Sequence, residues 1–235
     1  MERGTPVGRR VVLGMLGLGT AGVLTGRWLQ GREQRLLAVV GSRDPTGLSQ
    51  LLPAGAGFRF YSVVGRVPER TAAGYRLTVG GLVRRPGAVT LDDLRRLPRL
   101  ELTRDFQCVT GWRVPEVHWA GVALADLLQH AGVLPAAKAV RFTSFDGSYT
   151  ESLTLEQAQR RDVMVATEMQ GRPVSHDHGG PVRLYVAPMY GYKSVKWLDR
   201  IEVTDRVVPG YWERAGYDVD AWVGRSNGRD DAPTG

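Results

Sequence analysis

Short apolar runs separated by glycine, proline and polar residues recur along the chain from about residue 58 onward. Runs of this length that are rich in valine, phenylalanine and tyrosine predict β-strands, because such side chains fit a half-buried pleated surface. The predicted strands cover residues 60–65, 75–83, 139–145, 163–167, 182–187 and 199–204. No internal repeat accompanies them, which argues against a repeat architecture.

Helical signals are fewer and shorter. A helix is predicted to begin at Thr90, because a carboxylate follows three residues later at Asp93, as in a capping box. A second helix is predicted over residues 122–131, where leucines recur on one face and Gly132 can end the helix. Residues 155–160 predict one more short helix. Since the strands and helices do not alternate regularly, the sequence predicts an α+β fold with mixed β-sheets and interspersed short helices.

The N-terminal segment has the features of an export signal. Arg9 and Arg10 precede an apolar stretch over residues 11–24, which is short for a bilayer span and diluted by glycine. Twin arginines before such a stretch resemble a twin-arginine signal, which predicts an extracytoplasmic protein in the periplasm or at the outer face of the membrane. No small-residue cleavage site follows closely, so the segment can remain as a membrane anchor. A helix packed on the domain is the alternative.

The predicted elements divide the chain into segments. Residues 1–30 are the signal or anchor, residues 31–57 are a linker without sustained periodicity, and residues 58–208 are the main domain. Residues 209–235 form a tail whose tyrosines and tryptophans predict packing against the domain. The polar end of this tail, from Arg225 onward, is predicted to fray.

Charge excludes one class of partner and draws attention to one loop. The formal net charge is +7 at pH 7, but the basic residues are scattered, so we expect no nucleic-acid partner. Nearly all of the basic residues are arginines, and the lysines are Lys138, Lys193 and Lys196. Two lysines within residues 191–197 indicate a site that needs compact ammonium charges; a solvated turn is the alternative.

Cys108 is the single cysteine of the chain. It can form no internal disulfide, so its chemistry is that of a thiolate: nucleophilic attack, redox change or ligation of a soft metal. The alternative is a small buried hydrophobic residue. Glycine and tryptophan follow at Gly111 and Trp112, which allow close backbone approach and supply a rigid wall.

Two further segments carry groups suited to binding. Two histidines, two glycines and an arginine lie together between His176 and Arg183, a combination typical of anion sites. His176 and His178 could instead bind a metal, but a single cysteine elsewhere does not complete a zinc ligand set. Ser144 and Asp146 lie at the end of a predicted strand, where a polar turn is the alternative to a binding role.

Several motifs in this order resemble the molybdopterin-binding domain of the sulfite oxidase family, over about residues 58–204. The matching segments are 108–112 with 119–122 behind it, 177–184, and 191–198. Motifs that occur together at the family's separations are far more specific than any one of them. The resemblance implies the family's fold and its cofactor, one Mo-molybdopterin per chain.

The resemblance also implies roles for individual residues. Cys108 is implied as the thiolate that ligates molybdenum. Residues implied to contact the cofactor are Tyr61, Ser62, His178, Arg183, Ser194, Val195 and Lys196, with Asp146 or Ser144 at the strand end between them. Tyr149 and Tyr190 are candidates for the catalytic tyrosine on the substrate side. Arginine, lysine and backbone amides suit the pterin phosphate, and a soft thiolate suits the metal.

The implied activity is that of a molybdenum-dependent oxidoreductase that transfers an oxygen atom. Its substrate is a small oxyanion, as in sulfite oxidation, or an S-oxide or N-oxide such as methionine sulfoxide, which would be reduced; the direction stays open. We expect electron exchange with a separate cytochrome or membrane subunit, no haem, and a monomer. A non-catalytic domain that binds a cofactor or partner is the alternative from another class. A cysteine hydrolase would need Cys108 beside a histidine or at a helix N-terminus.

Overall fold

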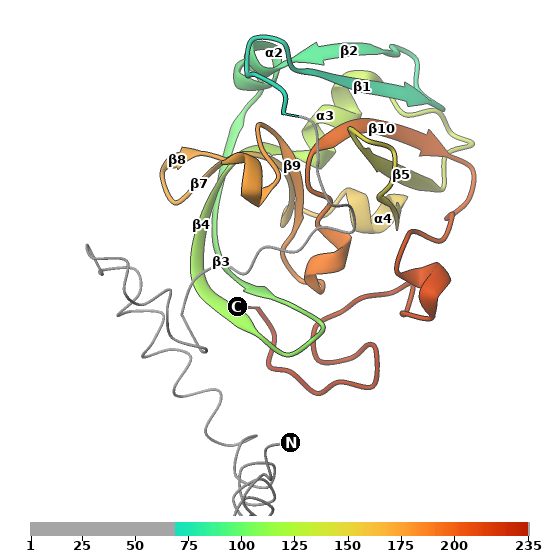
Figure 1. Ribbon diagram of the computed structural model, residues 1–235. Coiled ribbons are helices and arrows are strands. Elements are labelled where there is room, and N and C mark those ends of the chain that lie inside the picture. Colours follow the sequence, from blue (N-terminus) through green and yellow to red (C-terminus); the bar gives the residue numbers. More distant parts are fainter. Residues whose placement is uncertain (1–68, 235) are drawn as a thin grey trace, which may run out of the picture. The chain divides into compact units, whose positions relative to one another are not determined.

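The structure is a computed structural model that describes residues 69–234 (Figure 1). The predicted strand at residues 60–65 and the predicted cofactor contacts Tyr61 and Ser62 lie outside the described residues, as do the predicted signal and linker. Within residues 69–234, no helix is both long and apolar enough to cross a membrane.

Within residues 69–234 the strands form two five-stranded sheets, and the chain alternates between them. The first sheet has the order β2-β1-β10-β5-β6, with β1 Arg76–Gly81, β2 Gly87–Thr90, β5 Ala139–Ser144, β6 Thr150–Thr154 and β10 Leu198–Thr204. The second has the order β3-β4-β7-β8, with β9 paired to β7; these are β3 Arg99–Gln107, β4 Arg113–Ala123, β7 Val163–Met169, β8 Arg172–Pro173 and β9 Arg183–Val186. Strands β1 and β10 are parallel, whereas β1 and β2 are antiparallel. The predicted α+β fold with a mixed sheet is confirmed.

The predicted helix signals at Thr90 and Gly132 each mark one end of a short helix. Helix α2, Leu91–Arg96, starts at a complete capping box, in which the Asp93 amide donates to Thr90 Oγ1 and the Thr90 amide to the Asp93 carboxylate, each at 3.0 Å. Such a cap contributes about 1 kcal/mol. Helix α3, Leu124–Ala131, ends at Gly132, whose φ of 73° favours glycine. Helix α4 is Leu155–Ala158.

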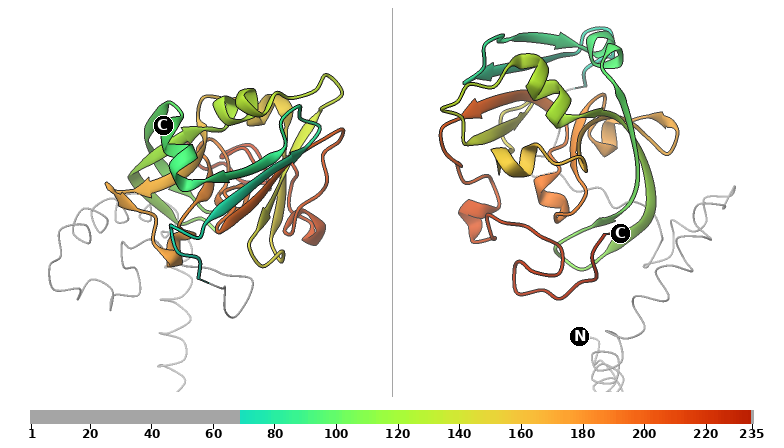
Figure 2. Two further views of the ribbon diagram at one scale, coloured as in Figure 1. Left: turned by 90° about the horizontal axis from the view of Figure 1, so that it is seen from above. Right: turned by 180° about the vertical axis from the view of Figure 1, so that it is seen from behind.

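The long hairpin β3–β4 was not predicted from the sequence. Strand β3 has few apolar residues, because leucine alternates with charged residues along it. Strand β4 contains Pro115, followed by Glu116 with a φ of 50°, and both features are unusual within a strand. The first two residues assigned to a helix, Val122 and Ala123, are the end of β4. Figures 1 and 2 show the hairpin curving along one side of the domain, and its turn carries Cys108.

One hydrophobic core joins the two sheets. Its buried side chains come from β1, β5 and β10 of the first sheet, from β7 and β9 of the second, and from the leucines of α3. Loss of this apolar surface from water is the dominant favourable contribution to folding. The core therefore fixes the strand ends and turns that carry the candidate site residues.

The C-terminal tail packs against the domain over its described length. The Tyr211 amide donates to the Thr150 carbonyl, and Trp222 forms a bridge with Met189. The end from Arg225 was predicted to fray, but Thr234 is buried and donates to the Ala187 carbonyl at 2.6 Å. The hairpin also holds this end, because the Asp105 amide donates to the Thr234 carbonyl. Polarity alone was therefore a poor guide to order in this segment.

Candidate functional site

Cys108 lies in the tight turn between β3 and β4. The Cys108 amide donates to the Trp112 carbonyl at 2.9 Å, and the Gly111 amide donates to the Cys108 carbonyl at 3.0 Å. Gly111 has a φ of 100°, which lets the turn close. Cys108 is partly exposed, and its sulfur contacts Thr110 Oγ1 at 3.1 Å. The turn thus presents a thiol rather than burying it as core filler.

A pocket of about 560 Å³ begins one residue after Cys108, at Val109. The tail forms the rest of its wall: Ala215, Gly216, Tyr217, Asp218, Asn227, Gly228 and Arg229. The wall is braced internally, because the Asp218 amide donates to Asn227 Oδ1 at 2.9 Å and the Asn227 amide donates to the Asp218 carboxylate. A small molecule in this pocket would lie next to the cysteine turn.

A buried arginine is the second component of the site. Arg183, at the start of β9, is 2% exposed and donates to the carbonyls of His178, Ser194 and Leu184 at 2.7, 3.1 and 3.4 Å. It forms no ion pair with a carboxylate among the described residues. A guanidinium has five N–H donors, so donors remain for a ligand. A buried charge of this kind is costly unless an anion compensates it.

Two further basic side chains share this electrostatic environment. Burial, and after it the charge of Arg183, lower the pKa of Lys196 to about 7 against the opposing charge of Asp177. Burial, Arg183 and Lys196 together lower the pKa of His178. Burial also lowers the pKa of Arg183 to about 10. Burial and mutual repulsion therefore disfavour the charged forms of this cluster of three groups, and a bound anion would stabilise those forms.

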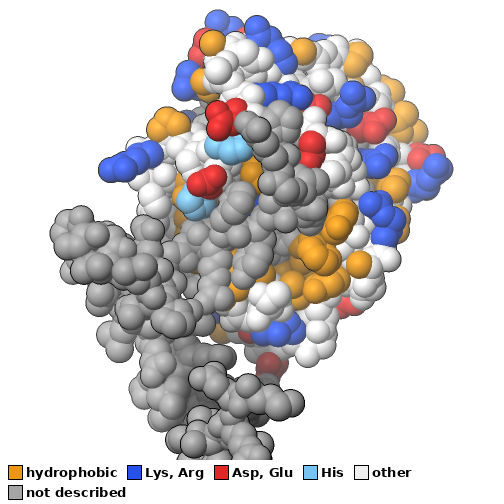
Figure 3. Space-filling view, viewed as in Figure 1, with side chains coloured by type: hydrophobic (Ala, Val, Ile, Leu, Met, Phe, Trp, Pro, Cys, Tyr) orange, Lys and Arg blue, Asp and Glu red, His pale blue; other side chains and the backbone are white. Residues whose placement is uncertain are grey.

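Two glycines let the backbone approach this cluster. The short 3-10 helix η2, His176–His178, ends at Gly179, which has a φ of 96°. A Cβ at Gly179 would lie 2.5 Å from the Lys196 Cβ, and one at Gly180 would lie 1.9 Å from the Val174 carbonyl oxygen. A side chain at Gly179 would push away the segment that carries Lys196, and one at Gly180 would clash with the backbone of its own loop. On the face shown in Figure 3, histidine and acidic side chains gather at the turn that follows β8.

The cysteine turn and the arginine cluster are joined by aromatic rings. Phe106, just before Cys108, stacks on Trp112 with centroids 5.6 Å apart, and the Arg183 guanidinium carbon lies 5.8 Å from the Phe106 ring. On the other side, Arg183 lies 5.2 Å from the ring of Trp119 in β4. A Cβ at Gly191 would lie 2.4 Å from Phe106 Cζ. The motifs singled out in the sequence therefore meet in one region.

The strand-end turn joins the same region. The Phe145 amide donates to the Trp197 carbonyl at 2.8 Å, which places Ser144 and Asp146 beside the segment that carries Lys196. Burial acts to raise the pKa of Asp146, but hydrogen bonds from Ser144 and Ser148 outweigh it and hold that pKa below its usual value. Ser144 Oγ donates to the Asp146 carboxylate at 2.5 Å. Within the described residues both groups stabilise their own turn.

Ser194 and Val195 fasten the lysine loop to β9. Both are buried, the Val186 amide donates to Ser194 Oγ at 3.0 Å, and the Leu184 amide donates to the Val195 carbonyl at 2.8 Å. The Ser194 side chain and the Val195 backbone therefore bind other parts of the protein itself. Of this predicted contact segment, Lys196 is the residue whose charge belongs to the cluster of Arg183.

The two candidate tyrosines do not line the pocket. Tyr149 Oη donates to the Tyr192 carbonyl at 2.6 Å, and Tyr190 Oη donates to Asp231 at 2.8 Å while accepting from the Gly224 amide. Both hydroxyls hold the tail or the lysine loop in place. Among the described residues that line the pocket, Tyr217 is the tyrosine.

The pocket residues of the tail were missed in the sequence. Tyr217, Asn227 and Arg229 lie more than one hundred residues after Cys108, in a stretch without strand or helix periodicity. Arg229 is held by Asp231 at 2.8 Å, and a Cβ at Gly111 would lie 2.9 Å from its guanidinium. The aromatic content of the tail predicted that it packs. It did not show where.

The geometry around Cys108 and the histidines bears on the remaining alternatives. The described residues contain no group of three or more His, Cys, Asp or Glu placed to hold a metal. In the same part of the chain, the hydrogen-bond partner of the Cys108 sulfur is Thr110, and no histidine takes that place. His178 Nδ1 lies 2.8 Å from Ser175 Oγ. The activated pair that a cysteine hydrolase requires is thus not formed among these residues.

Comparison with known proteins agrees with the geometry. A family model described as the oxidoreductase molybdopterin-binding domain matches residues 64–212. The chain is 35% identical over 150 residues to the uncharacterized oxidoreductase YuiH of Bacillus subtilis, which covers 63% of this chain and 75% of that protein. It is 32% identical over 188 residues to the putative protein-methionine-sulfoxide reductase subunit YedZ1 of Azospira oryzae, covering 78% of this chain and 70% of that one.

Larger proteins are similar over part of their length. The chain is 33% identical over 177 residues to sulfite oxidase of Arabidopsis thaliana, a match that covers 61% of this chain and 45% of that enzyme. The crystal structure of the sulfane dehydrogenase SoxCD from Paracoccus pantotrophus is similar with a TM-score of 0.56 and 29% identity, covering 60% of this chain and 41% of that chain. The chain thus spans less than half of these two proteins.

Proposed function

The chain belongs to the oxidoreductase molybdopterin-binding domain family, and we propose that it binds one Mo-molybdopterin and transfers an oxygen atom to or from a small substrate. The observation that carries the proposal is the buried Arg183 without a carboxylate partner among the described residues, joined through Phe106 to the partly exposed Cys108. The residues fit such a group, because one end supplies cationic donors for a phosphate and the other a soft thiolate for a metal.

Each residue has a defined part in this proposal. Arg183, Lys196 and His178 would hold the phosphate of the cofactor, with the backbone of residues 179–180 free of side-chain obstruction. Cys108 would ligate the molybdenum. When bound, the cofactor supplies the two-electron oxygen-atom chemistry. The tail residues then enclose the substrate beside the cysteine turn, with Tyr217 as a hydroxyl donor and Arg229 as a fixed cation.

We propose a sulfur compound as the substrate, either sulfite in the oxidative direction or methionine sulfoxide in the reductive one. Similarity to sulfite oxidase favours the first, and similarity to a putative protein-methionine-sulfoxide reductase subunit favours the second. The test is to assay purified protein for sulfite oxidation with ferricyanide and for methionine sulfoxide reduction with reduced benzyl viologen. Turnover in one assay selects the direction. Absence of turnover in both, with molybdenum present, would favour the non-catalytic alternative.

We also propose that the protein acts outside the cytoplasm and exchanges electrons with a separate cytochrome. The twin arginines Arg9 and Arg10 support the location, and they suit a protein that folds around a cofactor before export. Replacing both arginines with lysine is expected to leave the protein in the cytoplasmic fraction. Export of that variant at the wild-type level would count against the proposal.

Anion binding at the cluster is expected to weaken as pH rises. A bound anion favours the ammonium form of Lys196, whose pKa in the folded protein lies at about 7. Above that pH, binding must take up a proton, so affinity falls, by at most about tenfold per pH unit. Sulfate suits the measurement because it does not titrate between pH 6 and 9.

Calorimetry on cofactor-free protein gives the sulfate affinity across this range. Lys196→Met is expected to remove most of the pH dependence, and Lys138→Met, at an exposed lysine, is the matched control. An affinity that stays constant in the wild type would show that Lys196 does not contact the anion.

A further inference from the structure

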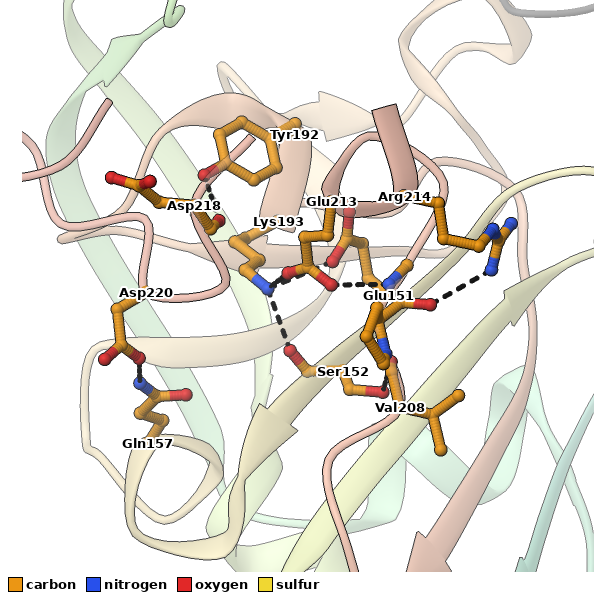
Figure 4. A network of polar contacts seen from close by, with 12 residues as sticks. Glu151, Ser152, Gln157, Tyr192, Lys193, Val208, Glu213, Arg214, Asp218 and Asp220 are labelled. Atoms are coloured by element: carbon orange, nitrogen blue, oxygen red, sulfur yellow. Dashed lines mark hydrogen bonds and ion pairs between the residues drawn. The ribbon is translucent and has the colours of Figure 1, made fainter. Parts of the chain in front are cut away.

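A buried lysine outside the cofactor cluster is held between two glutamates. Lys193, in the 3-10 helix η3 (Gly191–Lys193), has a fully buried side chain, and its ammonium donates to Glu151 at 3.1 Å, to the Ser152 carbonyl at 3.0 Å and to Glu213 (Figure 4). Both glutamate side chains are also fully buried. Glu151 belongs to β6 and Glu213 to the 3-10 helix η4, Glu213–Ala215. We call these three residues the Lys193 cluster.

The Lys193 cluster carries more acidic than basic groups. One ammonium can neutralise one carboxylate, and a second buried carboxylate would leave an uncompensated negative charge, which is strongly unfavourable. The other titratable groups that face Glu151 are tyrosines: Tyr149 Oη lies 3.4 Å from its carboxylate, and Tyr192 lies close enough to interact. No other cation of the described residues contacts either carboxylate. The arrangement therefore favours one retained proton on the pair of glutamates.

The pKa of Glu151 agrees with a retained proton on this pair of glutamates. Burial raises the pKa of Glu151 to about 8, Lys193 opposes the rise and Glu213 adds to it. A carboxyl whose pKa is raised in the folded state contributes stability that is complete below its ordinary pKa, declines as pH rises and is lost once pH passes the raised value. Ionisation of Glu151 would place a further negative charge beside Glu213 among side chains that are fully buried.

The Lys193 cluster fastens the tail to the domain at the start of the pocket wall. Glu213 accepts from the Gly210 amide, and a Cβ at Gly210 would lie 2.7 Å from the Glu151 carboxyl carbon, so the tail packs directly on that group. The wall begins two residues after Glu213, at Ala215, and continues through Tyr217.

A neighbouring contact ties the same wall to the same loop. Tyr192 Oη donates to the Asp218 carbonyl at 2.7 Å, and the Tyr192 ring meets the Tyr217 ring edge-on with centroids 5.6 Å apart. Residues 192 and 193 thus hold both ends of the segment 213–218. The next residues of the loop are Ser194 to Lys196, which belong to the proposed cofactor site. One loop therefore connects that site with the wall of the pocket.

We propose that the Lys193 cluster positions the wall of the pocket beside Cys108, and that it does so only while Glu151 keeps its proton. Loss of that proton at alkaline pH puts two ionised carboxylates on one ammonium and loosens the contact between Glu213 and β6. Segment 213–218 then opens more often. Lys193, Glu151 and Glu213 are positioning residues, since they act through Tyr217 and Asp218. The effect on substrate binding rests on the proposed function, whereas the effect on the wall does not.

Hydrogen exchange of the intact holoprotein tests the positioning without any assay of activity. The amides of Tyr211, Ala215 and Tyr217 are hydrogen-bonded within the tail or to β6, so their protection reports on this segment. After correction for the intrinsic pH dependence of exchange, wild-type protection is expected to fall about tenfold between pH 7 and pH 9. A change of this size corresponds to a difference of about one pH unit in the binding of one proton. Glu151→Gln has no titrating group at position 151, so its protection is expected to change less than about twofold over the same pH range.

The matched control is Glu156→Gln, at an exposed glutamate on α4, which should behave as the wild type does. Glu151→Gln keeps an oxygen acceptor for Lys193 and leaves Glu213 as its single counter-charge, so the fold is retained. Wild-type protection that is constant from pH 7 to pH 9 would overturn the proposal. So would a fall of equal size in Glu151→Gln.

Steady-state kinetics form the second arm, with sulfite and ferricyanide or methionine sulfoxide and reduced benzyl viologen. KM is expected to rise over the same pH range in the wild type and not in Glu151→Gln, with kcat changed equally in both. Failure of the proposed function would appear as absent turnover or absent molybdenum, while the exchange result still decides whether the Lys193 cluster positions the wall. If wild-type protection falls but the KM does not rise over this pH range, the wall moves without affecting substrate binding. That result would refute the proposed effect on substrate binding.

Discussion

Replacing Cys108 with serine is expected to lower turnover at least about 100-fold while leaving the fold intact. Loss of groups that merely orient metal ligands already costs about 10- to 100-fold in activity or metal affinity, and Cys108 is proposed as a direct ligand. The residue lies in a turn whose closing hydrogen bonds are made by backbone groups, so the side chain is not needed for the turn to form. Turnover, molybdenum content and pterin content would be measured on the same preparation.

The separation of these readouts makes the Cys108 experiment informative. Because the phosphate is proposed to be held by the cluster around Arg183, pterin should remain bound in the variant when turnover is lost. Thr110→Val is the matched control, since it removes the contact of Thr110 with the Cys108 sulfur and keeps the thiol. Wild-type turnover in Cys108→Ser would refute the assignment of Cys108 as the metal ligand.

Replacing Arg183 with methionine is expected to abolish retention of the pterin cofactor during purification. A hydrogen bond to a charged group contributes about 1.5–3 kcal/mol, so even one lost bond to the phosphate weakens binding about tenfold or more. The variant also loses the bonds from Arg183 to the carbonyls of His178 and Ser194, which hold the two loops of the cluster together. Pterin released on denaturation is quantified by fluorescence after oxidation.

Two controls separate phosphate binding from folding in the Arg183 experiment. Arg200→Met changes an exposed arginine on β10 and should retain wild-type pterin content. Arg183→Lys keeps the charge but loses the fork of donors, so it should retain an intermediate amount. A folded Arg183→Met protein with full pterin content would show that this arginine does not hold the phosphate.

Much of the fold was predictable because local patterns agree with the tertiary structure. The capping box at Thr90 and Asp93, the leucine spacing before Gly132 and the valine-rich run that becomes β7 each predict their element from a few adjacent residues. Hairpin β3–β4 was not predicted, because exposed charged residues and Pro115 interrupt the alternation of apolar and polar residues along its strands. Its pairing is established by contacts between strands, and these are not visible in either strand alone.

The cluster around Arg183 was predictable for a different reason. A short stretch of sequence contains His178, Arg183 and Lys196, and basic residues of these types indicate anion binding. The pocket wall was not predictable, because Tyr217 and Arg229 reach Val109 only through the path of the tail. Along that path Glu213 contacts Lys193 together with Glu151, and both glutamates look like ordinary surface residues in the sequence. Their burial beside Lys193 follows from packing over long sequence separations.

The molybdenum content of the intact protein tests the central claim most directly. The full chain would be produced in a host that synthesises Mo-molybdopterin, and metal would be measured by mass spectrometry against protein concentration. We predict about one molybdenum per chain, bound together with pterin and lost together with it on denaturation. Protein that contains no molybdenum or pterin under these conditions, with Cys108 reduced and intact, would contradict the assignment of this site.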